Sequence, residues 1–321
     1  MRSTILRELC AHRDEFVSGK QLAEKLGISR VAVWKHIEAL KEEGYDILGI
    51  SGRGYRIAGA YNVIIPEDII ESLSTSIIGR QLQVYRDVES TNRTARDLIR
   101  EGKAGEGTVV VARRQSGGRG RRGRSWVSPP GGLWFSLINQ PGLALQETAL
   151  FSLVFAVGIC RAIDKFLPGK AEIKWPNDIF LNGKKICGIL LELSGELEQA
   201  DYLISGIGIN VNLQRSAFEN EVRYTSTSLL EESGQYHELA AVLTAALTSL
   251  EHYYLLFMQE GFSPILDEFK SRCFHLGKNI RIAANNRILE GKSIDIDENG
   301  SLLLDTGFGI ERLTTGDVAL I

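Results

Sequence analysis

Four arginines and four glycines lie within residues 117–126, GGRGRRGRSW, between two apolar segments that have strand composition. GTVVVARR at 107–114 is rich in β-branched residues, and GLWFSLI at 132–138 follows the loop directly. A disordered RNA-binding tail repeats Arg-Gly units outside any folded core, whereas this run occurs once and inside one. The pattern therefore predicts a folded domain whose cationic loop receives an anionic ligand. A basic loop that is merely solvated is the alternative.

The bulk composition limits the remaining possibilities. A chain of 321 residues is long enough for two or three domains. The net charge is −3, so any affinity for nucleic acid must come from local basic patches. The charged start and the short apolar run near 149–159 predict a cytoplasmic protein without a membrane span. The cysteines show no CxxC spacing and are expected to be reduced thiols: Cys10, Cys160, Cys187 and Cys273.

The first sixty residues predict a winged helix-turn-helix. Gly27 ends one helix, and Ser29 caps a second helix that buries Val33, Ile37 and Leu40. A hairpin with a Gly-Arg-Gly tip at 52–54 follows, as a wing would. The candidate DNA contacts are Ser29, Arg30, Trp34, Lys35 and His36 on the second helix and Arg53 on the wing. A three-helix protein-interaction module is the alternative.

The rest of the chain reads as an α+β multidomain protein. We predict a DNA-binding domain at 1–60, a catalytic domain at 61–272 and a small C-terminal β-barrel at 273–321. A continuous helix is expected over 146–166, and Asn182-Gly183 predicts a type I′ hairpin turn. Turns at Asn285-Asn286 and Asn299-Gly300 separate short strands of the barrel.

Further polar motifs stand at predicted strand ends. They are KWPND at 174–178, KKICGILLEL at 184–193, GIGIN at 206–210, EST-N at 89–92 and Gln115. Together with GRGRRGR they resemble the biotin protein ligases, and with the helix-turn-helix they resemble the bifunctional bacterial ligase and biotin-operon repressor. The resemblance implies a central mixed sheet of the biotin/lipoate ligase type and an SH3-like C-terminal barrel. It covers nearly the whole chain.

In such enzymes the carboxylate of biotin attacks the α-phosphorus of ATP, and a lysine of a carrier domain then takes the biotinoyl group from the adenylate. The resemblance assigns catalysis to Lys185, Arg119 and Arg121. The biotin site would comprise Ser90, Thr91, Asn92, Gln115, Gly118, Arg119, Gly120, Arg121, Lys185 and Gly188. The nucleotide site would comprise Trp126, Asn177, Asp178 and Asn210, with Asp178 near Mg²⁺. Two positions depart from the family pattern: Val127, where many members have an aromatic residue, and Gly132, where some have asparagine.

The resemblance also implies partners. These are a biotin carboxyl carrier protein such as the acetyl-CoA carboxylase subunit, operator DNA of biotin synthesis and uptake genes, and a second copy of the chain. The loop buries little apolar surface, so it is expected to order on the adenylate and to promote the homodimer. The alternatives are a monofunctional ligase with a non-regulatory N-terminal domain, a nucleotide-sensing regulator without chemistry, and a lipoate-type ligase.

Overall fold

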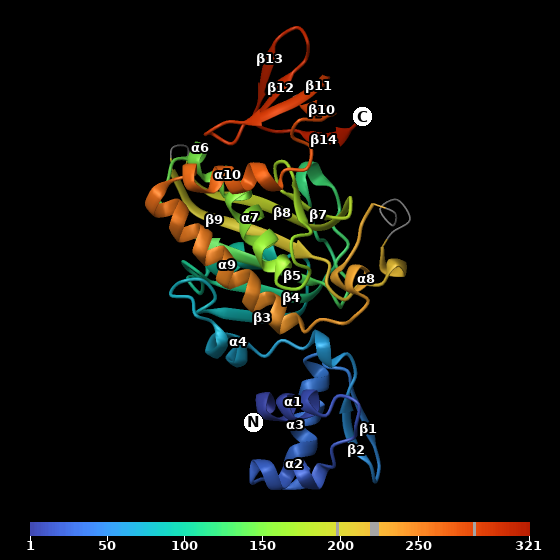
Figure 1. Cartoon of the computed structure of the whole chain (residues 1–321). Helices are drawn as coiled ribbons and strands as arrows, with labels where there is room; N and C mark the ends of the chain where they lie inside the picture. The colour runs from blue at the N-terminus through green and yellow to red at the C-terminus, as the bar shows by residue number, and fades with distance from the viewer. Residues whose placement is uncertain (197–198, 219–224, 285–286) are drawn as a thin grey trace.

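Three units follow one another along the molecule, from the N-terminal helices through a central sheet to the C-terminal strands (Figure 1). The computed structural model describes residues 1–196, 199–218, 225–284 and 287–321. The expected turn at Asn285-Asn286 lies outside the described residues. This arrangement confirms the α+β multidomain prediction.

The N-terminal unit is the predicted winged helix-turn-helix. It contains α1 (Arg2–Ala11), α2 (Gly19–Leu26), α3 (Arg30–Glu42) and the wing strands β1 (Ile47–Ile50) and β2 (Gly54–Ile57). Gly27 takes the left-handed conformation at the end of α2, with φ of 65°. Ser29 Oγ accepts the backbone N–H of Ala32 at 3.1 Å and so caps α3.

The central unit is a mixed sheet covered by helices. Its elements are α4 (Pro66–Ser72), β3 (Leu82–Val88), α5 (Thr91–Arg100), β4 (Val109–Gln115), β5 (Leu133–Asn139), α6 (Leu145–Thr148), α7 (Phe151–Asp164), β6 (Ala171–Lys174), β7 (Asp178–Leu181), β8 (Lys184–Glu196), β9 (Gln199–Ile209), α8 (Leu229–Ser233), α9 (Leu239–Glu260) and α10 (Ser263–Arg272). In the described residues the strand order is β3-β4-β5-β9-β8-β7-β6. The β3–β4 pair is parallel and the other pairs are antiparallel.

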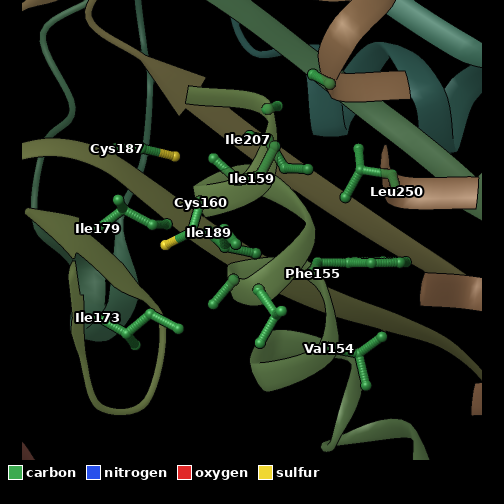
Figure 2. Close-up of a cluster of buried hydrophobic side chains, with 14 of the residues drawn as sticks. Val154, Phe155, Ile159, Cys160, Ile173, Ile179, Cys187, Ile189, Ile207 and Leu250 are labelled. Atoms are coloured by element: carbon green, nitrogen blue, oxygen red, sulfur yellow. The ribbon is translucent and has the colours of Figure 1, made fainter. Parts of the chain in front are cut away.

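The core of the central unit lies between the sheet and α7. Figure 2 shows Phe155 and Ile159 of α7 among Ile189 and Ile207, side chains from β8 and β9. On the opposite side, α5 packs through Ala95 and Leu98 against the same sheet. Burying this apolar surface on both faces fixes the sheet in place and leaves its strand ends to carry polar side chains.

Two helices differ from a simple sequence interpretation. The continuous helix expected over 146–166 is wrong: α6 ends at Thr148 and α7 begins at Phe151, where the N–H of Leu153 bonds to the carbonyl of Leu150, three residues back. The helix α9 is long and apolar enough to cross a membrane by length and composition, yet 61% of its apolar window is buried in the protein. It packs against α7 as a core helix does.

The C-terminal unit contains β10 (Asn279–Ala284), β11 (Arg287–Ile296), β12 (Leu302–Asp305), β13 (Ile310–Leu313) and β14 (Asp317–Leu320). As described, these strands form an antiparallel sheet in the order β13-β12-β11-β10-β14. The indole Nε1 of Trp175 donates to the Gly300 carbonyl at 2.9 Å, and the apolar core continues from one unit into the other. The limits of the three domains stay predictions.

Candidate active site

The strand register of the central sheet brings the strand ends that carry the polar motifs to one edge of the sheet. Parallel β3 and β4 end together, with Val88 opposite Gln115. In the antiparallel pairs each strand begins where its neighbour ends, so Lys174 pairs with Asp178 and Cys187 with Ile209. The motifs that are scattered from residue 89 to 210 therefore meet at one edge, because strand pairing alternates direction across this part of the sheet.

A cavity of about 830 Å³ opens at this edge. Nearly all of the predicted ligand residues line it: Ser90, Thr91, Asn92, Gln115, Arg119, Gly120, Arg121, Trp126, Asn177, Asp178, Lys185, Gly188 and Asn210. Gly118 does not line it. A Cβ on Gly118 would lie 2.4 Å from the Trp126 carbonyl oxygen, so this glycine permits close packing of the loop on itself.

The arginine loop reaches across to the C-terminal unit. Arg121 donates through Nη1 to Asn177 Oδ1 at 3.0 Å and through Nη2 to Thr315 Oγ1 at 2.6 Å. Arg122 donates to the Ala283 carbonyl at 3.3 Å, and Arg124 pairs with Asp317. Burial lowers the pKa of Arg121, which keeps its charge at neutral pH because an arginine pKa starts so high. The loop thus forms a cationic wall between two units.

Lys185, near the start of β8, lines the cavity. Its Nζ lies 2.7 Å from Asp178 Oδ1 and 5.1 Å from the ring centroid of Trp126. Its side chain is 28% exposed, so the ammonium group faces the cavity while its position is set by two partners. A mobile lysine would lose more entropy on binding a reactant than one already held in this way.

Thr91, Asn92 and Gln115, which line the cavity, belong to a hydrogen-bonded group of polar side chains. Gln115 Oε1 accepts the N–H of Thr91 at 2.8 Å and its hydroxyl at 3.1 Å, and Gln115 Nε2 donates to Ser128 Oγ at 2.9 Å. Ser136 Oγ lies 2.6 Å from Asn92 Oδ1. Ser90 stands at the N-cap position of α5, but its side chain makes no capping bond, so its hydroxyl is available to a ligand.

Glycines of β8 and β9 form the floor of the cavity. A Cβ on Gly206 would lie 2.4 Å from Asn92 Oδ1, and one on Gly208 would lie 2.5 Å from the Trp126 indole nitrogen. These two side chains therefore rest directly on the strand backbone. Among the described residues, Asn92 Nδ2 and Trp126 Nε1 are buried donors without a protein acceptor. Such donors are costly unless a ligand or water accepts from them.

Sequence reasoning missed several residues of this site. Lys174 and Asp317 line the cavity and are paired at 3.3 Å, although β14 is distant in the sequence. Although burial opposes it, the Arg124 hydrogen bond and the Lys174 charge hold the pKa of Asp317 below its usual range. Lys174 belongs to the KWPND motif and could have been included on that signal. Nothing in the local sequence marks Asp317, because only the tertiary fold brings β14 to the cavity.

The candidate DNA contacts lie apart from the cavity. Arg30, Lys35 and Trp34 are exposed on α3, and Trp34 is 52% exposed despite its size. His36 is partly buried. Arg53 at the wing tip stacks over the Phe16 ring at 4.6 Å from its centroid, which sequence reasoning did not anticipate.

Comparison with known proteins places the three units. Residues 84–210 match the model of the Biotin/lipoate A/B protein ligase family, residues 2–56 match an HTH domain, and residues 275–320 match the Biotin protein ligase C terminal domain. The bifunctional ligase/repressor BirA of Bacillus spizizenii is 40% identical over 100% of both chains, and that of Escherichia coli is 33% identical over 95% of this chain and 93% of its own.

A solved structure is similar as well. The biotin protein ligase from Aquifex aeolicus in complex with biotin and ATP has a TM-score of 0.66 and 30% identity, covering 75% of this chain and 99% of that one. The two BirA proteins are each more than 30% identical to this chain over nearly the full length of both chains, and in this chain a helix-turn-helix precedes the ligase domain. The chain belongs to the family of bifunctional biotin protein ligases and repressors.

Proposed function

We propose that the protein is an ATP-dependent biotin–protein ligase that also represses biotin synthesis and uptake genes. It would form biotinoyl-5′-AMP and transfer the biotinoyl group to a lysine of a biotin carboxyl carrier protein, such as a subunit of acetyl-CoA carboxylase. The observation that carries this proposal is the convergence of the loop arginines, Lys185 and the polar strand ends on one cavity. Family membership supports the same reaction.

The difficulty of the first step is electrostatic. An anionic carboxylate must approach an anionic triphosphate, so the site needs cations that are already in position. Lys185 would neutralise charge between the carboxylate and the α-phosphate, and Arg119 and Arg121 would cover the acyl-phosphate. All three residues line the cavity, and Lys185 is already paired with Asp178.

Two sets of residues that line the cavity suit two different ligands. The neutral ureido ring of biotin offers both donors and an acceptor, which suits Ser90, Thr91, Asn92 and Gln115. Trp126 provides a flat face for adenine, and Asn177, Asp178 and Asn210 would lie on the nucleotide side. The Asp178 carboxylate is a hard donor of the kind that Mg²⁺ prefers, and bound Mg²⁺ would offset phosphate charge there. The Asn177 amide oxygen already accepts a hydrogen bond from Arg121.

The direct test uses the purified chain with biotin, ATP, Mg²⁺ and a carrier domain. We expect one biotinoyl group on one carrier lysine by intact-mass measurement, and pyrophosphate release without the carrier. In a competition between biotin and lipoate, a lipoate-type ligase would instead use lipoate as its substrate. A regulator without chemistry would release no pyrophosphate.

The helix-turn-helix supports the second activity. One such motif reads one half-site, so operator binding would require a homodimer, and the adenylate would promote formation of that homodimer. Both activities would take place in the cytoplasm. Duplexes selected from a random pool with biotin and ATP present should contain two half-sites. A chain that ligates biotin but selects no duplex would instead be a monofunctional ligase with a non-regulatory N-terminal domain.

A further inference from the structure

We infer that Asn212 links the ligand cavity to the DNA-binding unit within one chain. It would do so by holding Asn62 in the interdomain linker, residues 58–65, which join β2 to α4. The inference rests on the proposed ligand-dependent DNA binding and adds to it an intramolecular connection. Asn212 follows β9 and lies outside the cavity lining.

The side chain of Asn212 is buried and fully bonded. It is 8% exposed. Its Oδ1 accepts the His237 N–H at 2.9 Å, and its Nδ2 donates to the His237 carbonyl at 2.7 Å and to Asn62 Oδ1 at 2.8 Å. Because every polar atom of the amide has a partner, Asn212 cannot move without breaking a bond or moving a neighbour.

Two segments of the cavity wall meet at Asn212. Asn210, two residues earlier, lines the cavity, and its backbone N–H bonds to the Ile186 carbonyl at 2.9 Å, beside Lys185. The backbone N–H of Asn212 bonds to the Gly131 carbonyl at 2.7 Å. Gly131 ends the short segment that follows Trp126, and a Cβ there would lie 3.1 Å from the Asn212 carbonyl oxygen. A ligand that shifts either segment therefore acts on Asn212.

The linker is held just as firmly on its other side. The Tyr61 ring stacks on Tyr236, with centroids 5.4 Å apart, and the Arg13 guanidinium lies 4.4 Å from the Tyr61 centroid. Arg13 of the N-terminal unit also pairs with Glu238 at 2.8 Å. Ala60 and Val63, which flank Tyr61 and Asn62, are packed into the core of the helix-turn-helix. Moving Asn62 therefore moves the DNA-binding unit.

This connection has a thermodynamic consequence. If adenylate binding favours one position of Asn212, it favours one orientation of the DNA-binding unit in each chain, before any partner binds. Dimerisation alone would instead change operator affinity only through the amount of dimer. The two routes can be separated by removing the Asn62 contact and measuring DNA binding at a fixed degree of association.

The test compares Asn62→Ala with wild type and with Arg7→Ala. Asn62→Ala removes one bond from Asn212 and leaves its bonds to His237, so the fold and the cavity are retained. Arg7→Ala removes another interdomain contact, the pair with Asp68, which does not involve the cavity. DNA affinity is measured for a duplex that wild type selects from a random pool, with and without biotin and ATP, alongside pyrophosphate release and sedimentation.

We expect ligands to raise the DNA affinity of wild type and Arg7→Ala by about 5- to 150-fold, the usual range of allosteric coupling. At matched dimer content the increase should fall at least fivefold in Asn62→Ala, while its pyrophosphate release stays within about twofold. Hydrogen exchange at residues 60–63 should slow on ligand binding in wild type and not in Asn62→Ala. An undiminished increase in Asn62→Ala would overturn the link, whereas the absence of DNA binding or pyrophosphate release in wild type would overturn the proposed function.

Discussion

At the scale of single residues, contacts distinguish positions that strand alternation alone leaves equivalent. Lys184 and Lys185 are adjacent, yet Lys185 pairs with Asp178 and lines the cavity, and Lys184 does not line it. Gly132, one of the two departures from the expected family pattern, has a structural reason. A Cβ there would lie 1.9 Å from the Trp134 ring, so no side chain fits. Val127 lines the cavity in place of an aromatic wall.

Replacing Lys185 should remove charge stabilisation that the transition state requires. We expect Lys185→Ala to lower the rate of pyrophosphate release by roughly 10²–10³, the usual cost of losing one preorganised group at a developing charge. The matched control is Lys184→Ala, which should stay within about twofold of wild type because no reacting group is near it. Equal rates in the two variants would contradict the assignment of Lys185.

His275 predicts how stability depends on pH. Burial, with the nearby charges of Lys174 and Lys278, lowers its pKa to about 4, and its Nε2 accepts the N–H of Trp175 at 3.2 Å. The unfolded chain binds this proton near pH 6.5 and the folded chain only near pH 4. Stability from this group is therefore complete above pH 6.5 and is lost as pH falls toward 4, by about 3 kcal/mol.

Chemical denaturation between pH 7 and pH 4 measures this loss. In His275→Gln the free energy of unfolding should depend less steeply on pH between pH 7 and pH 4, even if the variant is less stable at every pH. An unchanged slope would assign the acid sensitivity to carboxylates elsewhere.

At the scale of elements, successive side chains of β9 point to opposite faces of the sheet, so that one face packs in the core and the other supports the cavity. Ile207 and Ile209 point into the core on the α7 side, and Gly206 and Gly208 on the opposite face provide the floor on which Asn92 and Trp126 rest. The hairpin turn at Asn182-Gly183 was predicted correctly, and both residues have positive φ, 49° and 74°. Local chemistry dictates such a turn, so its prediction needs no tertiary information.

Adding a methyl group to the floor should displace the indole without damaging the core. We expect Gly208→Ala to reduce kcat/KM for ATP by about 10- to 100-fold, because small displacements in a site are costly. The neighbouring Ile209 is buried in the core and does not line the cavity, so Ile209→Val should cost about 1 kcal/mol of stability with little effect on kcat/KM. Steady-state kinetics and urea unfolding of both variants separate the two faces, and normal kinetics in Gly208→Ala would exclude the floor from the nucleotide site.

At the scale of the whole molecule, the cavity joins units that the sequence separates widely. Arg121 and Arg124 contact Thr315 and Asp317, so the arginine loop depends on the C-terminal unit for its position. Asn62 and Arg13 connect the N-terminal unit to the central unit, through Asn212 and Glu238. One ligand-binding event is therefore placed to influence all three units.

Self-association provides the measurement at this scale. If the adenylate orders the arginine loop and promotes the dimer, sedimentation should show more dimer with biotin and ATP than with biotin or ATP alone. Arg119→Ala, whose side chain is 69% exposed and lies at the rim, should weaken this increase. A distribution that is independent of ligands would remove the adenylate from control of assembly.

The sequence by itself determined what depends on neighbours along the chain. Gly27 and Ser29 specify the ends of two helices, Asn182-Gly183 specifies a hairpin, and the arginine loop and KWPND indicate a nucleotide-activating site. Only the tertiary structure decided what depends on distant pairing: that Lys185 pairs with Asp178, that Asp317 and Thr315 hold the loop, and that Asn212 contacts the linker. Strand register and domain packing bring these groups together, and neither is encoded in a short stretch of residues.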